Sequence, residues 1–277
     1  MSRPLVASLL LLCALNATAA QPHRIVSLNF CTDQLVMALV PPQRIASLTW
    51  LARTDGAAEQ RALAQRVPSN RGSAEEVLAS RPDLVLAGRY TTMTTRQLLG
   101  RVGVRMLEVD AVQDWDGIRR TTREVAAAVG EVARGEALIA RMDAQLAEAA
   151  TLRASVPLRA IGWSGAAEDV PGEDTVFNTI LVTAGATNIA ARPVGSSGFD
   201  LEEVLRARPR VLLRGIAYNE DRSLRSGVAD HPVLRALPGL AIIDYPEGAW
   251  ACGVPAAAGY ALQLARTLRA LPAEAAR

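Results

Sequence analysis

Aromatic side chains at the ends of predicted strands are the residues of this chain best suited to binding chemistry. Aromatic residues make up only 4% of the chain, yet five of them follow or end short apolar runs typical of buried strands: Trp50, Tyr90, Trp163, Tyr218 and Tyr245. The adjoining turns hold Phe30, Phe199 and Trp250. Parallel α/β sheets bind ligands beyond the carboxyl ends of their strands, where aromatic rings supply apolar area and stacking. The pattern predicts a cleft for a large ligand.

Two of these aromatic residues also fit a packed core. Trp163 and Tyr245 lie closest to apolar runs, so burial explains them as well as ligand binding does. Trp50 and Tyr90 are flanked by Thr and Arg. Polar neighbours favour an exposed ring, and we expect Trp50 and Tyr90 to face the ligand.

Arginine supplies all of the strong positive charge, because the 30 basic residues include no Lys. Arg89 and Arg214 stand at predicted strand ends and would suit an anionic group on a ligand, although exposed arginines are common in such a chain. The net charge is +2 with both signs mixed along the sequence. A nucleic-acid partner is therefore not expected.

The sequence offers no catalytic constellation. Its two histidines, His23 and His231, stand alone, so a hydrolase triad lacks a base. The segment 195–198 is a Gly-Ser turn without the G-x-S-x-G pattern, and phosphate-binding and dinucleotide-binding glycine motifs are missing. His, Cys and carboxylates do not cluster as metal ligands do. We expect no catalytic residues, no metal site, no cofactor and no enzymatic activity.

An internal repeat indicates the elements that position the aromatic residues. Residues 74–88 read AEEVLASRPDLVLAG, and residues 201–215 read LEEVLRARPRVLLRG. Each copy predicts a short helix stopped by Arg-Pro, then a buried strand, then a Gly turn. A helix entering a buried strand is half of an α/β layer, so two copies predict two similar α/β lobes with parallel sheets.

The repeat also duplicates its helix starts. Ser73 and Asp200 are good N-caps, and the glutamate three residues after each can complete a capping box. Glu75 and Glu202 then have no local role. A favourable interaction with the helix macrodipole explains each of them singly. As a pair, one per lobe, they are candidates for a contact surface.

One long helix is predicted between the lobes. Residues 131–155 are rich in Ala, Leu, Glu and Arg, with an apolar face at helical spacing. A helix of this length spans roughly 36 Å and is a rigid spacer. The predicted organisation is an N-terminal lobe at 21–130, the linking helix at 131–155 and a C-terminal lobe at 156–277.

The first twenty residues, 1–20, have the pattern of a cleaved secretory signal peptide: Arg3, a short apolar run, then small residues. Export is expected, and the apolar run is too short to span a bilayer. Removal of the signal leaves Cys31 and Cys252. An oxidising compartment permits a disulfide between them, and two buried thiols would fit equally well.

Taken together, the opening R-I-V-S-L, the repeated E-E-V-L and R-P motifs and the rigid linking helix resemble one family. The chain is similar over nearly all of its length to the substrate-binding proteins of ABC importers for vitamin B12, ferric siderophores and haem. The resemblance implies two Rossmann-like lobes with limited hinge motion, a monomer in the periplasm, and a ligand between the lobes. The implied partner is an inner-membrane ABC permease dimer with its cytoplasmic ATPase.

The resemblance assigns roles to residues. It implies that Glu75 and Glu202 pair with arginines of the permease. The positions that match the family's ligand-contacting loops are Asn29, Phe30, Thr49, Trp50, Arg89, Tyr90, Trp163, Phe199, Tyr218 and Trp250. A Cys31–Cys252 bridge would tie the lobes across the cleft mouth.

The ligand class stays open between an iron complex and a corrinoid. Haem-binding relatives usually offer Tyr or His to iron, for which Tyr90 or Tyr218 would serve. The aromatic residues suit a corrinoid and the arginines suit a ferric siderophore, which ranks first because it is the broader class. The alternatives are an exported enzyme on this scaffold and a module that senses a ligand without transport.

Overall fold

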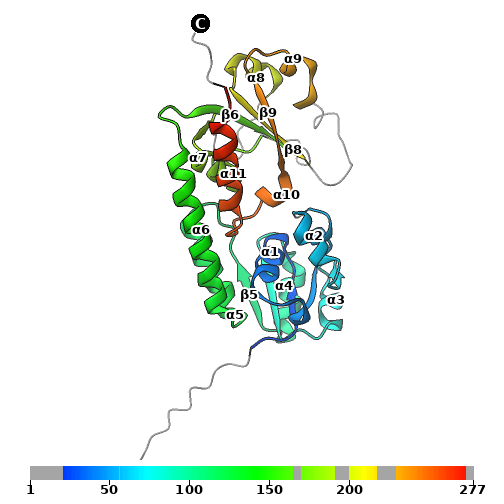
Figure 1. The fold of residues 1–277 in the computed structure, drawn as a ribbon. Helices are drawn as coiled ribbons and strands as arrows, with labels where there is room; N and C mark the ends of the chain where they lie inside the picture. The colour runs from blue at the N-terminus through cyan, green and yellow to red at the C-terminus, as the bar shows by residue number, and fades with distance from the viewer. Residues whose placement is uncertain (1–20, 56, 165–169, 191–199, 217–228, 273–277) are drawn as a thin grey trace, which may run out of the picture.

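The computed structural model describes residues 21–55, 57–164, 170–190, 200–216 and 229–272. They form two lobes, one above the other in Figure 1. Lobe one holds a parallel sheet in the order β3-β2-β1-β4-β5. Its strands are β1 (Ile25–Ser27), β2 (Ile45–Thr49), β3 (Ser69–Asn70), β4 (Leu84–Gly88) and β5 (Met106–Val109).

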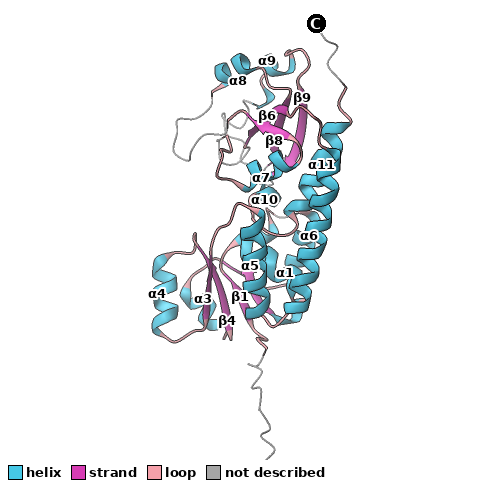
Figure 2. Cartoon of the chain, turned by 90° about the vertical axis from the view of Figure 1, so that its left-hand side faces the viewer, coloured by secondary structure: helices cyan, strands magenta, loops and turns pink. Residues whose placement is uncertain are grey.

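Helices cover both faces of the sheet of lobe one. Figure 2 shows α3 and α4 on one face and α1 and α5 on the other. The helical segments are α1 (Phe30–Leu39), η1 (Pro42–Arg44), η2 (Trp50–Arg53), α2 (Ala58–Ala64), α3 (Ala74–Ala79), α4 (Met93–Arg101) and α5 (Trp115–Ala128). The interior strand β4 is buried along its whole length, as expected of a parallel strand covered on both sides.

Asn29, Phe30 and Cys31 are turn-like in sequence, which favours a helix start at residue 32 or 33. Instead, the Asn29 side chain accepts a hydrogen bond from the Cys31 backbone N–H at 2.9 Å. This cap starts the helix at Phe30, so Cys31 belongs to the first turn of α1.

Lobe two repeats the plan with a parallel sheet in the order β7-β6-β8-β9. Its strands are β6 (Leu158–Trp163), β7 (Ala186–Asn188), β8 (Val211–Ile216) and β9 (Ala241–Pro246). Its helices are α7 (Val176–Thr183), α8 (Leu201–Ala207), α9 (Pro232–Arg235), α10 (Glu247–Trp250) and α11 (Ala257–Arg269). The predicted fold class of two α/β lobes with parallel sheets is confirmed.

The two sequence repeats occupy equivalent places in the lobes. The first forms α3 and β4, and the second forms α8 and β8. Both helices have complete capping boxes, with Ser73 accepting from the Glu76 N–H and Asp200 from the Glu203 N–H. The Arg before each Pro has a left-handed backbone, with φ of 46° at Arg81 and 44° at Arg208.

Helix α6 (Val132–Leu152) links the lobes and packs against α5 of lobe one and α11 of lobe two. Its 21 residues correspond to about 32 Å at the α-helical rise. It lies within the predicted range 131–155 and ends where Arg153 turns to an extended backbone. No helix among the described residues is long and apolar enough to cross a membrane.

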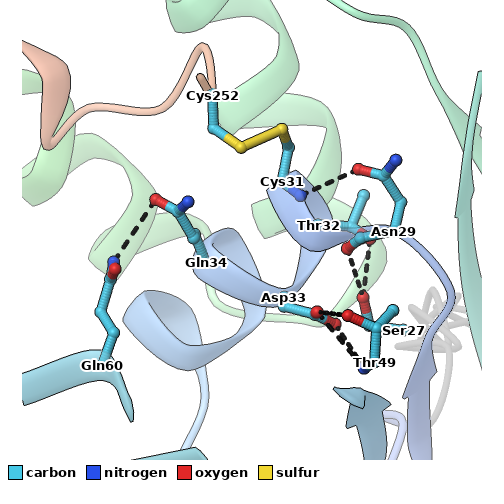
Figure 3. Close-up of a disulfide and its surroundings, with 9 residues drawn as sticks. All are labelled: Ser27, Asn29, Cys31, Thr32, Asp33, Gln34, Thr49, Gln60 and Cys252. Atoms are coloured by element: carbon cyan, nitrogen blue, oxygen red, sulfur yellow. Dashed lines mark hydrogen bonds between the residues drawn. A yellow bond between two sulfur atoms is a disulfide. The ribbon is translucent and has the colours of Figure 1, made fainter. Parts of the chain in front are cut away.

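A second connection between the lobes was not predicted from the helix pattern. After α10, the chain returns to lobe one, where Cys252 and Val254 are buried in the core beside α1 and β2. Cys252 is joined to Cys31 by a disulfide, with the two Cα atoms 5.2 Å apart (Figure 3). A segment that lies between two helices of lobe two in sequence therefore packs as part of lobe one.

Candidate ligand-binding cleft

A cavity of about 460 Å³ lies between the lobes and is lined by both. Lobe one contributes Cys31 and Leu35 of α1, Tyr90 after β4, and residues 109–113 at and after β5. Lobe two contributes Ser164 after β6, residues 174–177 at the start of α7, Tyr245, Glu247 and Trp250. These positions lie at or beyond the carboxyl ends of strands in both lobes, where a parallel sheet binds ligands. We call this cavity the interlobe cleft.

Three aromatic rings from lobe two form one wall of the cleft. Ring centroids of Phe177, Tyr245 and Trp250 lie 4.8 to 5.7 Å apart in tilted arrangements. The three rings are only 3 to 5% exposed and belong to the core of lobe two as well as to the cleft lining. Such contacts fix each ring, so this wall is rigid before a ligand arrives. Burial and the nearby Glu247 raise the pKa of the Tyr245 hydroxyl, so the wall carries no charge of its own at neutral pH.

Phe177 was missed by sequence reasoning. It lies within the apolar segment VFNTILV of α7, which is typical of a helix face packed on a core. Its ring does pack there, beside Tyr245 and Trp250, and it also lines the cleft. The only sequence signal was its position in the first turn of the helix, close to the strand ends.

The predicted aromatic residues of lobe one all come shortly after the ends of its strands. Tyr90 is 80% exposed and lines the cleft. Trp50 is 44% exposed at the end of β2, and Phe30 is half-buried in α1. Neither of these two lines the cleft, and Arg89 lines a neighbouring groove with residues 108–114. Of this group, only Tyr90 stands at the cleft wall.

Two predicted ligand contacts serve the fold of lobe one instead. The Asn29 side chain caps α1, and it lies so close to Gly88 that a Cβ there would be 2.8 Å from the Asn29 Cγ. The Thr49 hydroxyl donates a hydrogen bond of 2.5 Å to Asp33 inside the lobe. Both side chains have local partners, and neither lines the cleft.

One predicted contact in lobe two, Trp163, lies away from the cleft. Trp163 is only 5% exposed and packs in a cluster with Leu212 and Leu234. This burial corresponds to the core alternative for Trp163.

Arg214 forms ion pairs with Asp230 and Asp244, the latter through two hydrogen bonds of 2.7 and 3.0 Å. Two carboxylates already neutralise its guanidinium, and Arg214 does not line the cleft. Phe199 and Tyr218 lie outside the described residues.

Carboxylates supply the charge of the cleft. Asp110 stands on the lobe-one side, and Asp174 and Glu247 stand on the lobe-two side. The Ser164 hydroxyl donates a hydrogen bond to the Glu247 carboxylate. No Arg or His is among the described residues that line the cleft. The described part of the chain also holds no group of three metal-ligating side chains.

A buried carboxyl group lies under the disulfide. Asp33 accepts hydrogen bonds from the Thr49 hydroxyl and, at 3.2 Å, from the Thr49 backbone N–H (Figure 3). Burial raises the pKa of Asp33 to about 7, although its hydrogen bonds with Ser27 and Thr49 work in the opposite direction. Sequence reasoning passed over Asp33, which looked like an ordinary acid in a first helical turn.

The two candidate docking residues are exposed and lie at equivalent places. Glu75 is the second residue of α3, and Glu202 is the second residue of α8. In each helix the capping box uses the next glutamate, Glu76 or Glu203. The lobes thus present one exposed carboxylate each at the start of a repeated helix.

The fold and the cleft define a class: two-lobed proteins that capture a ligand between parallel α/β lobes joined by a helix. The sequence identifies the family within that class. The chain belongs to the family described as "Periplasmic binding protein", which it matches over residues 25–241. The family resemblance drawn from the motifs is confirmed, and the family is one of binding proteins.

Individual relatives match at lower similarity. A "Cobalamin-binding protein" of Halobacterium salinarum is 26% identical over 223 residues, which cover 78% of this chain. The match covers 60% of the length of that relative.

Solved structures share the fold. The haem-binding protein RhuT from Roseiflexus sp. RS-1 has a TM-score of 0.71 at 24% identity, covering 89% of this chain and 98% of RhuT. The haem-binding HutB of Vibrio cholerae has a TM-score of 0.70 at 20% identity, covering 90% and 98%. The vitamin B12-binding BtuF of Vibrio cholerae has a TM-score of 0.66 at 16% identity, covering 90% and 97%.

Proposed function

We propose that this chain is the substrate-binding subunit of an ABC importer and captures a large ring-shaped ligand, a corrinoid or an iron complex, in the interlobe cleft. The observation that carries the proposal is the rigid wall of Phe177, Tyr245 and Trp250 facing lobe one across a cavity of about 460 Å³. A wall of packed aromatic rings suits a broad, partly apolar ligand better than a small polar one.

A corrinoid is the first candidate. Its edge carries amide groups, which donate hydrogen bonds, and the exposed carboxylates of Asp110 and Asp174 accept them. The same carboxylates would repel the anionic edge of haem or of many ferric siderophores. The cobalamin-binding relatives support this order, which reverses the ranking made from the sequence.

Haem is the second candidate because of Tyr90. This phenol is 80% exposed and lines the cleft, and Tyr is one of the side chains that ligate haem iron in proteins. Ring binding against the lobe-two wall would then be combined with coordination from lobe one.

Delivery requires export and a partner. We propose that residues 1–20 are a signal peptide that sends the protein to the periplasm as a monomer. Glu75 and Glu202 then dock on arginines of the inner-membrane permease, whose cytoplasmic ATPase drives import. An exported enzyme is disfavoured because the family consists of binding proteins. A sensing module without transport is distinguished by the uptake experiment below.

Tryptophan fluorescence of the mature protein tests the ligand. Cyanocobalamin, haemin and two ferric siderophores are titrated with correction for their absorbance. We expect saturable quenching by cyanocobalamin at micromolar concentration or below. Trp250→Ala should weaken the affinity for cyanocobalamin by roughly 5- to 150-fold, since one well-packed aromatic contact contributes about 1 to 3 kcal/mol. Tyr260→Phe is the control, because Tyr260 contacts Trp250 from outside the cleft.

Haemin as the single saturating ligand would move the proposal to the second candidate. Tyr90→Phe should then abolish a tyrosinate-to-iron absorbance band. The control variant Tyr260→Phe should keep this band. Failure of all the ligands to bind would overturn the capture of a ring-shaped ligand.

Charge reversal tests the docking assignment. The double variant Glu75→Arg and Glu202→Arg should lose ligand uptake in cells and keep its affinity in solution, because both side chains are exposed away from the cleft. The matched control reverses the charge of Glu59 and Glu124 on α2 and α5, which are exposed and do not line the cleft. Normal uptake by the docking variant would contradict transport through these two residues.

A further inference from the structure

We propose that lobe two carries a second binding site, for a single-chain anionic amphiphile such as a fatty carboxylate. The site is a groove of about 470 Å³ at the end of lobe two remote from lobe one. It lies where α6 ends, β6 begins and α11 ends, near the top of Figure 1. Its volume falls in the range of ordinary small-molecule pockets, about 300 to 1,000 Å³.

The floor of the groove is apolar. Its side chains come from three elements: Leu152 of α6, Val156 and Leu158 at the start of β6, and Leu268 and Leu271 at the end of α11. Val156 is 74% exposed, which is unusual for a large apolar side chain. An alkyl chain lying in the groove would remove this apolar surface from water, which favours binding.

The rim of the groove is positively charged. Four arginines line it, Arg159, Arg208, Arg210 and Arg269, and no acidic residue is among its described lining residues. Arg159 donates to the Ala207 carbonyl at 3.0 Å, and Arg210 donates to the Pro272 carbonyl at 2.7 Å. Arg208 and Arg269 are exposed, and neither has an acidic partner within the described chain.

The internal repeat shows that one of these charges is particular to lobe two. Arg208 corresponds to Arg81 of lobe one, and both have a left-handed backbone before a proline. Two residues later, lobe one has Asp83, whose carboxylate accepts hydrogen bonds from the His23 and Arg24 backbone N–H groups at 2.7 and 3.0 Å. Lobe two has Arg210 at that position. The acidic residue Asp83 of lobe one is thus replaced by the basic residue Arg210 in lobe two.

An apolar floor with a cationic rim matches one ligand chemistry. The alkyl chain of a fatty carboxylate fits the floor, and its head group accepts charge-assisted hydrogen bonds from Arg208 and Arg269. A cationic or uncharged head group gains nothing from the rim. The groove is separate from the interlobe cleft and shares no lining residue with it, so this site stands independently of the proposed function.

Isothermal titration calorimetry with dodecanoate, below its micelle concentration, tests the site on the full mature protein. We expect one saturable site per chain and affinity that falls as salt rises. The double variant Arg208→Gln and Arg269→Gln should bind about tenfold or more weakly, as expected for loss of charge-assisted hydrogen bonds. Arg81→Gln is the matched control, since Arg81 has the same backbone conformation in lobe one and should bind as wild type.

A second pair of variants tests the floor. Val156→Asp places a carboxylate in the groove and should abolish dodecanoate binding. Val132→Asp makes the same change at an exposed position of α6 outside the groove, where Val132 is 57% exposed, and should have no effect. Both side chains are exposed in the folded protein, so neither substitution removes a core contact.

Three results would overturn the site. The first is equal binding of dodecyltrimethylammonium, which carries the opposite charge. The second is an equal loss of dodecanoate affinity in Arg81→Gln and in the double variant Arg208→Gln and Arg269→Gln. The third is binding to phosphatidylglycerol vesicles without binding of monomeric dodecanoate, which would make the arginines a membrane-contacting patch.

Discussion

The carboxyl group of Asp33 is buried between α1 and β2, and its protonation state changes near neutral pH. Its pKa is about 7 in the folded protein, mainly because burial disfavours the charged form. In the unfolded chain the pKa is near 3.9. Between these two values the folded state binds more protons than the unfolded state, so this group makes the protein less stable as pH rises. The loss is about 4 kcal/mol between pH 4 and pH 8.

We therefore expect the unfolding free energies of wild type and Asp33→Asn to diverge with pH. Asn carries no charge, so urea denaturation should show the variant gaining several kcal/mol on wild type between pH 5 and pH 8. Thr49→Val removes a hydrogen bond that lowers the pKa of Asp33. The pH range over which stability falls should therefore move to higher pH in this variant. Parallel pH profiles for wild type and Asp33→Asn would show that Asp33 is charged throughout.

At the scale of elements, the segment from α10 to α11 depends on close backbone contact with lobe one. A Cβ at Gly253 would lie 2.2 Å from the Val112 carbonyl oxygen. A backbone atom cannot move aside as a flexible side chain would, so we expect Gly253→Ala to destabilise the protein by about 1 to 3 kcal/mol. Gly100→Ala on α4 is the control, because a Cβ there meets nothing within 4 Å.

Thermal and urea denaturation measure both variants. Gly100→Ala should be neutral or more stable by up to about 1 kcal/mol, because Ala favours a helix over Gly. Equal stability of Gly253→Ala and wild type would mean that the segment moves away from Val112 without cost, and that it does not hold the lobes together.

The elements themselves were largely predictable from the sequence, because their signals are local. The repeat, both capping boxes and the Arg-Pro stops specify α3, β4, α8 and β8 from neighbouring residues alone. The cleft was less predictable. Trp163 ends β6 and Trp250 follows β9. Both are buried, and only the packing of the sheets makes Trp250, unlike Trp163, a part of the cleft wall. The packing of Cys252 in lobe one depends on the chain's return across the molecule, for which no local pattern exists.

At the scale of the whole molecule, three connections restrain the lobes. Helix α6 packs on both of them, the segment around Gly253 lies against Val112, and the Cys31–Cys252 disulfide joins positions 221 residues apart. In addition, the Trp115 indole N–H donates to the Thr183 hydroxyl across the junction at 2.9 Å. Such a molecule is preorganised, so ligand binding costs little reordering and needs little closure.

Removing the disulfide should release part of this restraint. In the double variant Cys31→Ser and Cys252→Ser, we expect a lower melting temperature, because cross-linking a loop of this length stabilises a protein by up to about 5 kcal/mol. Small-angle X-ray scattering should show a larger radius of gyration for the variant without ligand. A reductant should shift wild type toward the variant and leave the variant unchanged. Identical scattering of the oxidised wild type and the variant would show that α6 and the Gly253 segment hold the lobes without the disulfide, whose role would then be confined to stability.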